Sequence, residues 1–329
     1  MPQRACVVGN LNIDLIVRGV PDLPRWGQEV AGTSHVAASA GQAGYLALAL
    51  ARLGTAVGVV ANVGDDAFGR QIVDDLRRAG IDTRAVETAA GATGISVGIV
   101  RADGERAFVS DFASLGDFDL ALVERHWDVV AAADVVALVG QCCLPRITPA
   151  VARHILGRAR AAGKTTVLDT GWDPAGWPPE TVAGVRALLA EVRVFLPNRD
   201  EAAALTGTDD PAAAARLLLA DGPEIVVVKS GADGSLAVTR ETEVALPALP
   251  VEVRDAVGAG DTFDGGFLHG LARGWPLERS LAFGNAAAAI YVSRLSDRFP
   301  AAGEVEAAAA RLLPPGGTPT RTAAGSADR

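Results

Sequence analysis

The sequence has too few cysteines for a disulfide framework. Its three cysteines, Cys6, Cys142 and Cys143, are odd in number, and two of them are adjacent. This pattern is typical of reduced thiols in the cytosol rather than of a cross-linked secreted fold. The four histidines are scattered and lack the spacing of metal ligands. We therefore expect a cytoplasmic protein without a metal centre built from histidine and cysteine.

Long hydrophobic runs are also missing. The longest are rich in Ala, interrupted by polar residues and shorter than a membrane span, and the apolar segment 6–9 is too short for a signal peptide. Positive charge is scarce as well, because the formal net charge is -9, whereas nucleic acid binding requires a surplus of Lys and Arg. We expect neither a membrane nor a nucleic acid as partner.

Two common nucleotide-binding motifs are absent. No Gly-x-x-x-x-Gly-Lys-Ser/Thr loop occurs, which excludes the P-loop kinases. The first predicted strand, residues 5–9, is not followed by Gly-x-Gly-x-x-Gly, which argues against a Rossmann dinucleotide enzyme. Any nucleotide site must therefore be built in another way.

The 329 residues, of which 49% are hydrophobic, are sufficient for one large α/β domain or two ordinary ones. Apolar strand-like runs alternate with helical periodicity through most of the chain, which predicts a parallel sheet covered on both faces. The predicted strands are 5–9, 57–62, 135–139, 165–169, 193–196 and 224–230, and the predicted helices 46–53, 148–162, 181–190, 261–271 and 277–292.

A turn of small residues, Gly258-Ala259-Gly260, leads into the predicted helix that starts at Asp261. Such a turn leaves backbone N–H groups unpaired at a helix start and creates an anion site suited to phosphate. A carboxylate at its rim would repel an anion but can accept a proton from an attacking hydroxyl. The structural alternative is that Asp261 only caps the helix.

The segment 255–263 closely resembles the Asp-Thr-x-Gly-Ala-Gly-Asp signature of the PfkB family, the ribokinase-like sugar and nucleoside kinases. The resemblance implies a ribokinase-like three-layer α/β/α sandwich, with a mostly parallel central sheet and a small β-sheet lid. The kinase domain would span residues 1–313, with lid segments at about 12–36 and 93–111. The Pro/Gly/Thr/Ala-rich stretch 314–329 is predicted to be a disordered tail.

The same resemblance implies an ATP-dependent phosphotransferase in which Asp261 is the general base and the amides of Gly258, Ala259 and Gly260 form the anion hole. It implies substrate contacts by Asn12, Asp14, Gly41, Gln42 and Tyr45. At position 45 relatives usually have Asn, so Tyr45 puts ordinary ribose recognition in doubt.

Further residues match the family's nucleotide and metal contacts. They are Asn198, Lys229, Ser230, Gly231, Gly234 and Asn285 for ATP, Asn198 and Glu201 for water-bridged Mg²⁺, and Asp255 and Val257 for half of a site for K⁺ or another monovalent cation. The other half is altered near Ser296, which makes K⁺ activation doubtful. Alternatives remain open: Asn198 and Glu201 can form a capping box, Lys229 can be merely solvated, and Asn285 can be a core hydrogen-bonding residue.

Two other groups have a structural as well as a functional interpretation. Asp65 and Asp66 precede a predicted helix, and we favour capping and packing for both. Trp172 and Trp177 can line a pocket or pack against the edge of the sheet.

The function that we predict is phosphoryl transfer from ATP to a hydroxymethyl group of a sugar. The alternative is a nucleoside kinase in which Tyr45 stacks on the base. A non-catalytic sensor on a kinase fold ranks lower, because Asp261 and the small-residue turn are both present. The resemblance also implies that the protein can form a homodimer through the lid.

Overall fold

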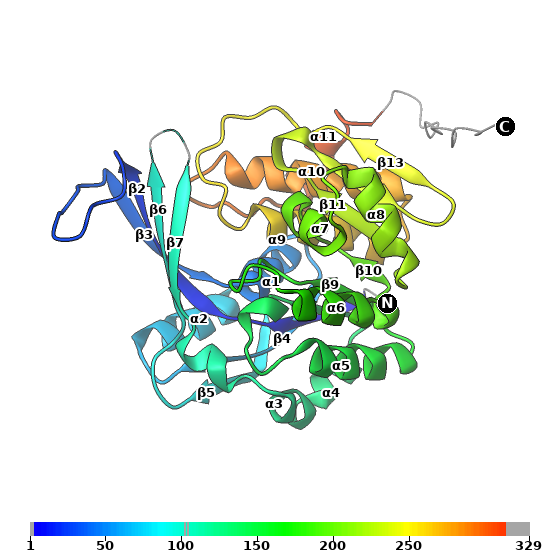
Figure 1. The fold of residues 1–329 in the computed structure, drawn as a ribbon, viewed down its shortest axis with the longest axis horizontal. Coiled ribbons are helices and arrows are strands. Elements are labelled where there is room, and N and C mark those ends of the chain that lie inside the picture. The colour runs from blue at the N-terminus through cyan, green and yellow to red at the C-terminus, as the bar shows by residue number, and fades with distance from the viewer. Residues whose placement is uncertain (1–2, 102, 104, 314–329) are drawn as a thin grey trace.

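The computed structural model describes residues 3–101, 103 and 105–313, and within these ranges the strands form a sheet of nine and a sheet of four (Figure 1). Helices cover both faces of the larger sheet, and the smaller sheet projects from the body. This is the ribokinase-like α/β arrangement that was predicted. The tail predicted at 314–329 lies outside the described residues.

The larger sheet has the strand order β13-β12-β11-β10-β9-β8-β1-β4-β5. All neighbouring pairs from β11 to β5 are parallel, whereas β12 and β13 are antiparallel. Its strands, in chain order, are β1 (Arg4–Gly9), β4 (Ala56–Gly64), β5 (Asp82–Ala89), β8 (Val135–Val139), β9 (Thr165–Asp169), β10 (Val194–Phe195), β11 (Ile225–Lys229), β12 (Ser235–Val238) and β13 (Glu243–Leu246). The predicted strands are confirmed to within two residues at each end, and β5, β12 and β13 were not predicted.

The helix α9 packs between α1 and α10, while α1 also packs on β1 and β4 and α10 on β12 and β13. The described helices are α1 (Gln42–Arg52), α2 (Ala67–Arg78), α3 (Leu120–Arg125), α4 (Trp127–Ala131), α5 (Pro149–Ala161), α6 (Pro179–Leu188), α7 (Arg199–Thr206), α8 (Pro211–Ala220), α9 (Ala259–Ala272), α10 (Leu277–Val292) and α11 (Ala302–Ala309), with short 3₁₀ turns η1 (Ala113–Asp117), η2 (Gln141–Cys143), η3 (Leu189–Glu191) and η4 (Gly231–Asp233). Side-chain caps from Asp66, Thr148 and Asn198 fix where three of them begin.

The lid is the four-stranded sheet, with the order β3-β2-β6-β7. Its strands are β2 (Asn12–Val20), β3 (Ser34–Ala40), β6 (Ile95–Arg101) and β7 (Arg106–Asp111). The chain passes from the main sheet into the lid through Asn10 and Leu11, so Asn12 and Asp14 lie at the base of the lid. The strands β6 and β7 pair antiparallel within the predicted lid segment 93–111, and β3 extends beyond the predicted limit of 36.

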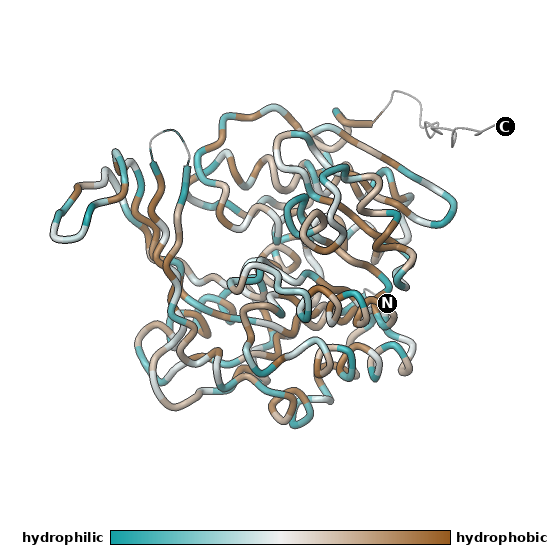
Figure 2. Tube along the Cα trace, viewed as in Figure 1, coloured by the Kyte–Doolittle hydropathy of each residue, from teal (hydrophilic) through white to brown (hydrophobic). Residues whose placement is uncertain are grey.

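The hydrophobic core follows the strands of the main sheet. Val7, Val8 and Val226 have no exposed surface, because parallel strands covered on both faces are apolar throughout. In Figure 2 the hydrophilic colour gathers at outer loops such as the turn between β12 and β13. Within the described residues, no helix combines the length and the hydropathy that a membrane span would need.

Candidate active site

The candidate site lies at the carboxyl-terminal ends of β1, β9 and β11. Asn10 follows β1 directly, Asp169 ends β9 and Lys229 ends β11. The start of α9 approaches the same edge, since a Cβ atom on Gly260 would lie 3.6 Å from Lys229 Nζ. Open α/β sheets bind their ligands outside the carboxyl ends of the strands, so the placement is that of a ligand site.

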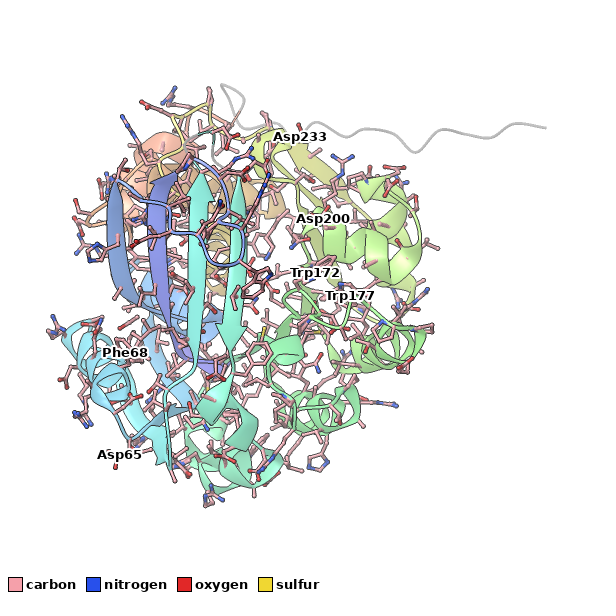
Figure 3. The ribbon with its side chains drawn as sticks, turned by 60° about the vertical axis from the view of Figure 1, so that its left-hand side comes forward. Asp65, Phe68, Trp172, Trp177, Asp200 and Asp233 are labelled. Carbon is pink, nitrogen blue, oxygen red and sulfur yellow. The ribbon has the colours of Figure 1, made fainter. Side chains whose placement is uncertain are left out.

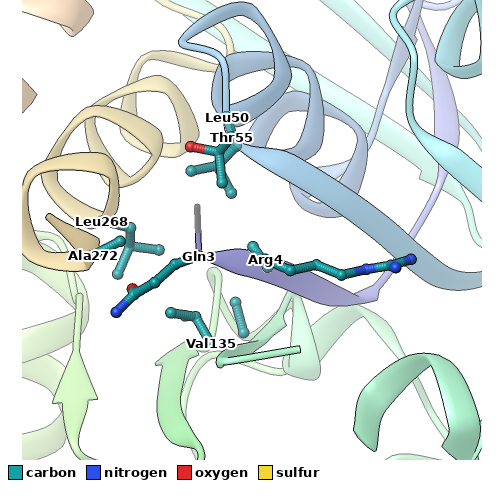
Figure 4. Close-up of a pocket in the computed structure, with 9 residues that line it drawn as sticks. Gln3, Arg4, Leu50, Thr55, Val135, Leu268 and Ala272 are labelled. Atoms are coloured by element: carbon teal, nitrogen blue, oxygen red, sulfur yellow. The ribbon is translucent and has the colours of Figure 1, made fainter. Parts of the chain in front are cut away.

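A small cavity lies at the opposite edge, where the strands begin (Figure 4). Arg4 at the start of β1 and Val135 at the start of β8 line it, together with the apolar side chains of Leu50 and Leu268. Its volume of about 10 Å³ leaves room for about one water molecule. We assign this cavity to packing.

The start of α9 has three unpaired amides. In the described part of the chain, the N–H groups of Gly258, Gly260 and Asp261 have no acceptor, whereas Ala259 donates its N–H to the carbonyl of Ala256 at 3.2 Å. The amide of Asp261 therefore takes the place predicted for that of Ala259. Free amides at a helix N-terminus attract anions, so the turn retains the geometry of an anion hole.

Gly258 is required here by conformation and by space. Its φ of 81° lies in the left-handed region that side chains disfavour. A Cβ atom at this position would approach the Tyr291 hydroxyl to 2.7 Å and the Tyr45 ring to 2.9 Å. Any larger residue would push the turn away from these two rings.

Asp261 is a partly buried carboxylate in the first turn of α9. Burial raises its pKa well above the ordinary value, and the negative charge of Asp169 raises it further, while Lys229 opposes the shift. A raised pKa brings a carboxylate closer to the pH at which a general base is most effective. The geometry and the pKa both suit the predicted role of proton acceptor.

Behind the anion hole lies a buried charge cluster of Lys229, Asp169 and Asp264. The Lys229 ammonium donates to Asp169 Oδ2 at 2.7 Å and to both oxygens of Asp264 at 3.0 Å. Burial alone would lower the pKa of Lys229, but the two carboxylates outweigh it and raise that pKa. The hydrogen bonds of Lys229 are thus directed at these two carboxylates, and a contact between Lys229 and ATP stays a prediction.

The predicted substrate residues at the base of the lid form a hydrogen-bonded chain. Asn10 donates to Asn12 at 3.3 Å, Asn12 donates to Asp14 Oδ1 at 2.8 Å, and the Tyr45 hydroxyl donates to Asp14 Oδ2 at 2.8 Å. Burial raises the pKa of Asp14 to about 6, although the bonds from Tyr45 and Asn12 lower it. Each Asp14 oxygen thus already holds one donor from the protein.

Gly41 and Gln42 join the lid base to the main sheet. Gly41 has a φ of 82°, and a Cβ atom there would lie 2.3 Å from the carbonyl oxygen of Asn10. Gln42 donates through Nε2 to Asp169 Oδ1 at 3.1 Å. Both residues therefore lie between the lid base and the buried charge cluster, and their contacts with a substrate stay a prediction.

The ring of Tyr45 packs behind Gly258 rather than into open space. Only 6% of Tyr45 is exposed, and its ring lies 6.4 Å edge-to-face from Tyr291 and 6.5 Å from Phe299, centre to centre. The aromatic side chain that replaces the usual Asn is therefore part of a small cluster beneath the anion hole.

Asn198 and Glu201 form the capping box that was the structural alternative. Asn198 Oδ1 accepts from the Glu201 amide at 2.9 Å, and Glu201 Oε2 accepts from the Asn198 amide at 2.8 Å. Burial, and then the charge of Asp169, raises the pKa of Glu201 to about 8. Within the described residues no donor reaches Glu201 Oε1, so this hard oxygen suits a water-bridged Mg²⁺ ion.

The residues predicted to bind ATP differ in whether their polar groups are already hydrogen-bonded within the protein. Ser230 and Gly231 lie at the surface turn η4, and Gly234 closes that turn with a φ of 94°. Asn285 accepts from Ser235 Oγ at 2.9 Å and donates to the carbonyl of Pro247 at 3.1 Å. These bonds confirm the core alternative for Asn285, while the contacts of the turn with ATP stay a prediction.

The predicted monovalent-cation ligands are engaged by arginine. Asp255 Oδ2 accepts from Arg18 of β2 and, at 3.1 Å, from Arg298 Nη1. Arg298 Nη2 also donates to the carbonyl oxygens of Asp255 at 2.7 Å and of Val257 at 3.1 Å. The oxygen donors left for K⁺ on this side are already hydrogen-bonded.

Two other groups take structural positions. Asp66 caps α2 through the Gly69 amide at 2.7 Å, which confirms the capping interpretation. Trp172, 53% exposed, and Trp177, 8% exposed, pack edge-to-face at 6.1 Å. Figure 3 shows the two indoles together, far from Asp65. The role of the two tryptophans in lining a pocket therefore stays a prediction.

Four charged residues of this region were not assigned any role from the sequence: Asp169, Asp264, Arg18 and Arg298. Asp264 follows Asp261 by three positions and shares its helical face, a spacing that could have suggested it. Arg18 and Arg298 are 237 and 43 residues from Asp255 in sequence, and no local pattern connects such distant partners.

Comparison with known proteins agrees with this geometry. The pfkB family carbohydrate kinase profile matches residues 2–302. The 5-dehydro-2-deoxygluconokinase of Geobacillus thermodenitrificans is 28% identical over 318 residues, covering 93% of this chain and 92% of the relative. The ribokinase of Bacillus subtilis is 28% identical over 290 residues, covering 88% and 93%.

A solved structure has the same fold. Ribokinase of Arabidopsis thaliana, complexed with ribose and ATP, superposes with a TM-score of 0.80 at 24% identity and covers 94% of this chain and 99% of that one. With a family profile that spans almost the whole described chain and relatives aligned over nearly their full length, the protein belongs to the pfkB family of carbohydrate kinases and is an ATP-dependent sugar kinase.

Proposed function

We propose that Asp261 is the general base that activates a hydroxymethyl group of the sugar for attack on the γ-phosphorus of ATP. The supporting observation is a carboxylate with a raised pKa in the same helical turn as three unpaired amides. The sugar oxygen forms the new P–O bond, the bond from phosphorus to the ADP oxygen breaks, and Asp261 takes the hydroxyl proton.

The amides of Gly258, Gly260 and Asp261 stabilise the negative charge that spreads over the transferring group. Mg²⁺, when bound with ATP, neutralises phosphate charge, and Asn198 and Glu201 would hold it through water. Ser230, Gly231 and Gly234 would border the nucleotide at the turn after β11.

Asn12, Asp14, Gly41 and Gln42 would grip the sugar between the lid and the main sheet. A sugar about the size of ribose or 5-dehydro-2-deoxygluconate is the best candidate, since these are the substrates in the names of the relatives. The nucleoside alternative is weaker, because the Tyr45 ring is packed on Tyr291 and offers no free face for a base.

The test measures ADP release from MgATP with ribose, 5-dehydro-2-deoxygluconate, other pentoses and hexoses, and nucleosides. We expect activity with a sugar, and we expect Asp261→Asn to lose about 10²–10⁴ in kcat with little change in ATP affinity. Asp200→Asn, an exposed carboxylate on α7, is the matched control. A kcat for Asp261→Asn within about threefold of wild type would overturn the assignment of the base.

We also propose a homodimer through the lid, in the cytoplasm. Val109 of β7 is 72% exposed and Trp26 of the lid loop is fully exposed, and apolar side chains of this size favour an interface. Light scattering of wild type and Val109→Glu tests the dimer, which the charged side chain should dissociate. The cytoplasmic location rests on the cysteine pattern of the sequence, an odd number with two adjacent residues, which is typical of reduced thiols.

A further inference from the structure

Arg298 makes a set of contacts that a surface arginine does not. One terminal nitrogen donates to the Asp255 carboxylate, and the other donates to the carbonyl oxygens of Asp255 and Val257. The guanidinium carbon also lies 3.9 Å from the centre of the Tyr291 ring. Only 15% of the Arg298 side chain is exposed, so the cation is held on several sides within the protein.

This is the place where the sequence predicted ligands for a monovalent cation. Carbonyl and carboxylate oxygens are the donors that such an ion requires, but here a guanidinium already uses both carbonyls and one oxygen of the carboxylate. A guanidinium is a permanent cation that reaches several acceptors at once. The donor set therefore does not fit an added ion and fits the resident arginine.

The charge balance supports the same interpretation. Asp255 contributes one negative charge, while Arg18 and Arg298 each contribute one positive charge to the same carboxylate. The group thus has a net charge of about +1, the charge of a monovalent ion. This positive charge lies immediately before Gly258, where the amides of the anion hole begin.

The contacts also hold the shape of the turn. The second carboxylate oxygen of Asp255 accepts from the Val257 amide at 2.9 Å, and Arg298 binds the carbonyls on either side of Ala256. The backbone from Asp255 to Val257 is therefore fixed from both its amide and its carbonyl sides. Because Gly258 follows directly, the direction of the free amides depends on this clamp.

We propose that Arg298 is a built-in positioning cation, which holds the turn before the anion hole and makes the enzyme independent of monovalent cations. This inference rests on the proposed function, since it concerns the same anion hole. The first measurement needs no variant: kcat, and the melting temperature, of the wild type in choline chloride and in KCl at equal ionic strength. We expect both to agree, with kcat within about twofold. A wild type that KCl activates about fivefold or more would overturn the proposal.

The second measurement uses Arg298→Ala, with Arg294→Ala as the matched control. Arg294 is four residues away and pairs with Glu304 at the surface. We expect Arg298→Ala to lose about 10- to 100-fold in kcat, as misplaced catalytic groups do, and to recover at least part of it in millimolar guanidinium chloride or KCl but not in choline chloride. Arg294→Ala should be close to wild type in every salt.

Two results would refute the positioning role. One is a kcat for Arg298→Ala equal to that of the control. The other is a folded Arg298→Ala that loses activity and recovers with no cation, because then the side chain serves only as packing. If Arg298→Ala does not fold, Arg298→Lys retains a charge and a long side chain, and the same salts should change its kcat and melting temperature more than those of the control.

The melting temperature and ATP binding by calorimetry separate this proposal from the proposed function. If no sugar is phosphorylated by the wild type, the function proposed above fails, while Arg298→Ala can still be compared with the control for stabilisation by guanidinium. Selective stabilisation of Arg298→Ala would then support the resident cation, and equal behaviour of the two variants would refute it.

Discussion

Replacing Lys229 by Met tests whether the cluster behind the anion hole is held by charge. Met is similar in length, so little space is left, but Asp169 and Asp264 lose the ammonium that lies 2.7 and 3.0 Å away. Removing one partner of a buried ion pair costs about 3–5 kcal/mol. Burial keeps the pKa of Asp264 well above its ordinary value, so Asp264 can hold a proton, and we expect the lower limit of about 3 kcal/mol.

The loss of stability in Lys229→Met should depend on pH because Asp169 titrates. Burial tends to raise the pKa of Asp169, but the charge of Lys229 and the hydrogen bonds from Asp264, Lys229 and the Gly171 amide together hold that pKa below the ordinary 3.8. This contribution to stability is therefore complete above the pKa of the unfolded chain and is lost as the pH falls through the lower folded value. Without Lys229, burial raises the pKa of Asp169 in the folded protein instead. The difference in free energy of unfolding between wild type and variant is therefore largest at neutral pH and becomes smaller as the pH falls toward about 4.

The assay is thermal unfolding of both proteins between pH 8 and about 4.5. At about 2–4 °C per kcal/mol, the variant should melt roughly 6–12 °C below wild type at neutral pH. Lys164→Met is the control, because the only other lysine donates at the surface to the carbonyl of Ala131. A decrease in the free energy of unfolding below about 1 kcal/mol, or a difference in melting temperature that does not change with pH, would contradict the charges assigned to Lys229 and Asp169.

Three further predictions concern the same site. Asp169→Asn removes a negative charge that raises the pKa of Asp261, so the acidic limb of the pH profile of kcat/KM should move to lower pH; an unmoved limb would disprove this coupling. Tyr45→Phe removes a buried donor to Asp14 and should lower the free energy of unfolding by about 1–3 kcal/mol. Because the pKa of Asp14 then rises above about 6, the melting temperature of the variant should fall further below that of wild type at alkaline pH, where Asp14 is charged. Glu201→Gln retains the capping oxygen but cannot ionise as Glu201 does above its raised pKa of about 8. Above that pH the variant should need a higher Mg²⁺ concentration for half-maximal activity, while its melting temperature changes little. A Mg²⁺ titration that stays unchanged there would remove Glu201 from the metal site.

The parts of the fold that the sequence predicted are those with strong local patterns. Strands β8 and β9 and helix α10 have the predicted limits, because buried apolar runs and helical periodicity identify them without knowledge of partners. Strands β12 and β13 were not predicted, since they are four residues long and lie at the edge of the sheet. Short edge strands are defined by their pairing, which the local sequence does not encode.

The candidate site was predictable where adjacent residues act together. Gly258, Gly260 and Asp261 lie in one turn, so their free amides follow from helix geometry. The partners of Asp255 were not predictable, because Arg18 comes from the lid and Arg298 from the segment after α10. Asn285 was predicted to contact ATP, but its side chain donates to the backbone carbonyl of Pro247 near β13, a partner that the local sequence does not indicate.

Tyr45, which departs from the family pattern, and Arg298 are physically connected. The guanidinium of Arg298 covers one face of Tyr291, the Tyr291 ring meets Tyr45, and the Tyr45 hydroxyl binds Asp14. The chain of contacts runs from the turn before the anion hole to a carboxylate predicted to hold the sugar. Groups that share partners in this way do not act independently. Restoring Asn at position 45 alone would therefore leave Tyr291 with only Phe299 as an aromatic neighbour among the described residues and would remove the donor to Asp14 Oδ2. The usual substrate pocket would thus require changes at both ends of the chain of contacts.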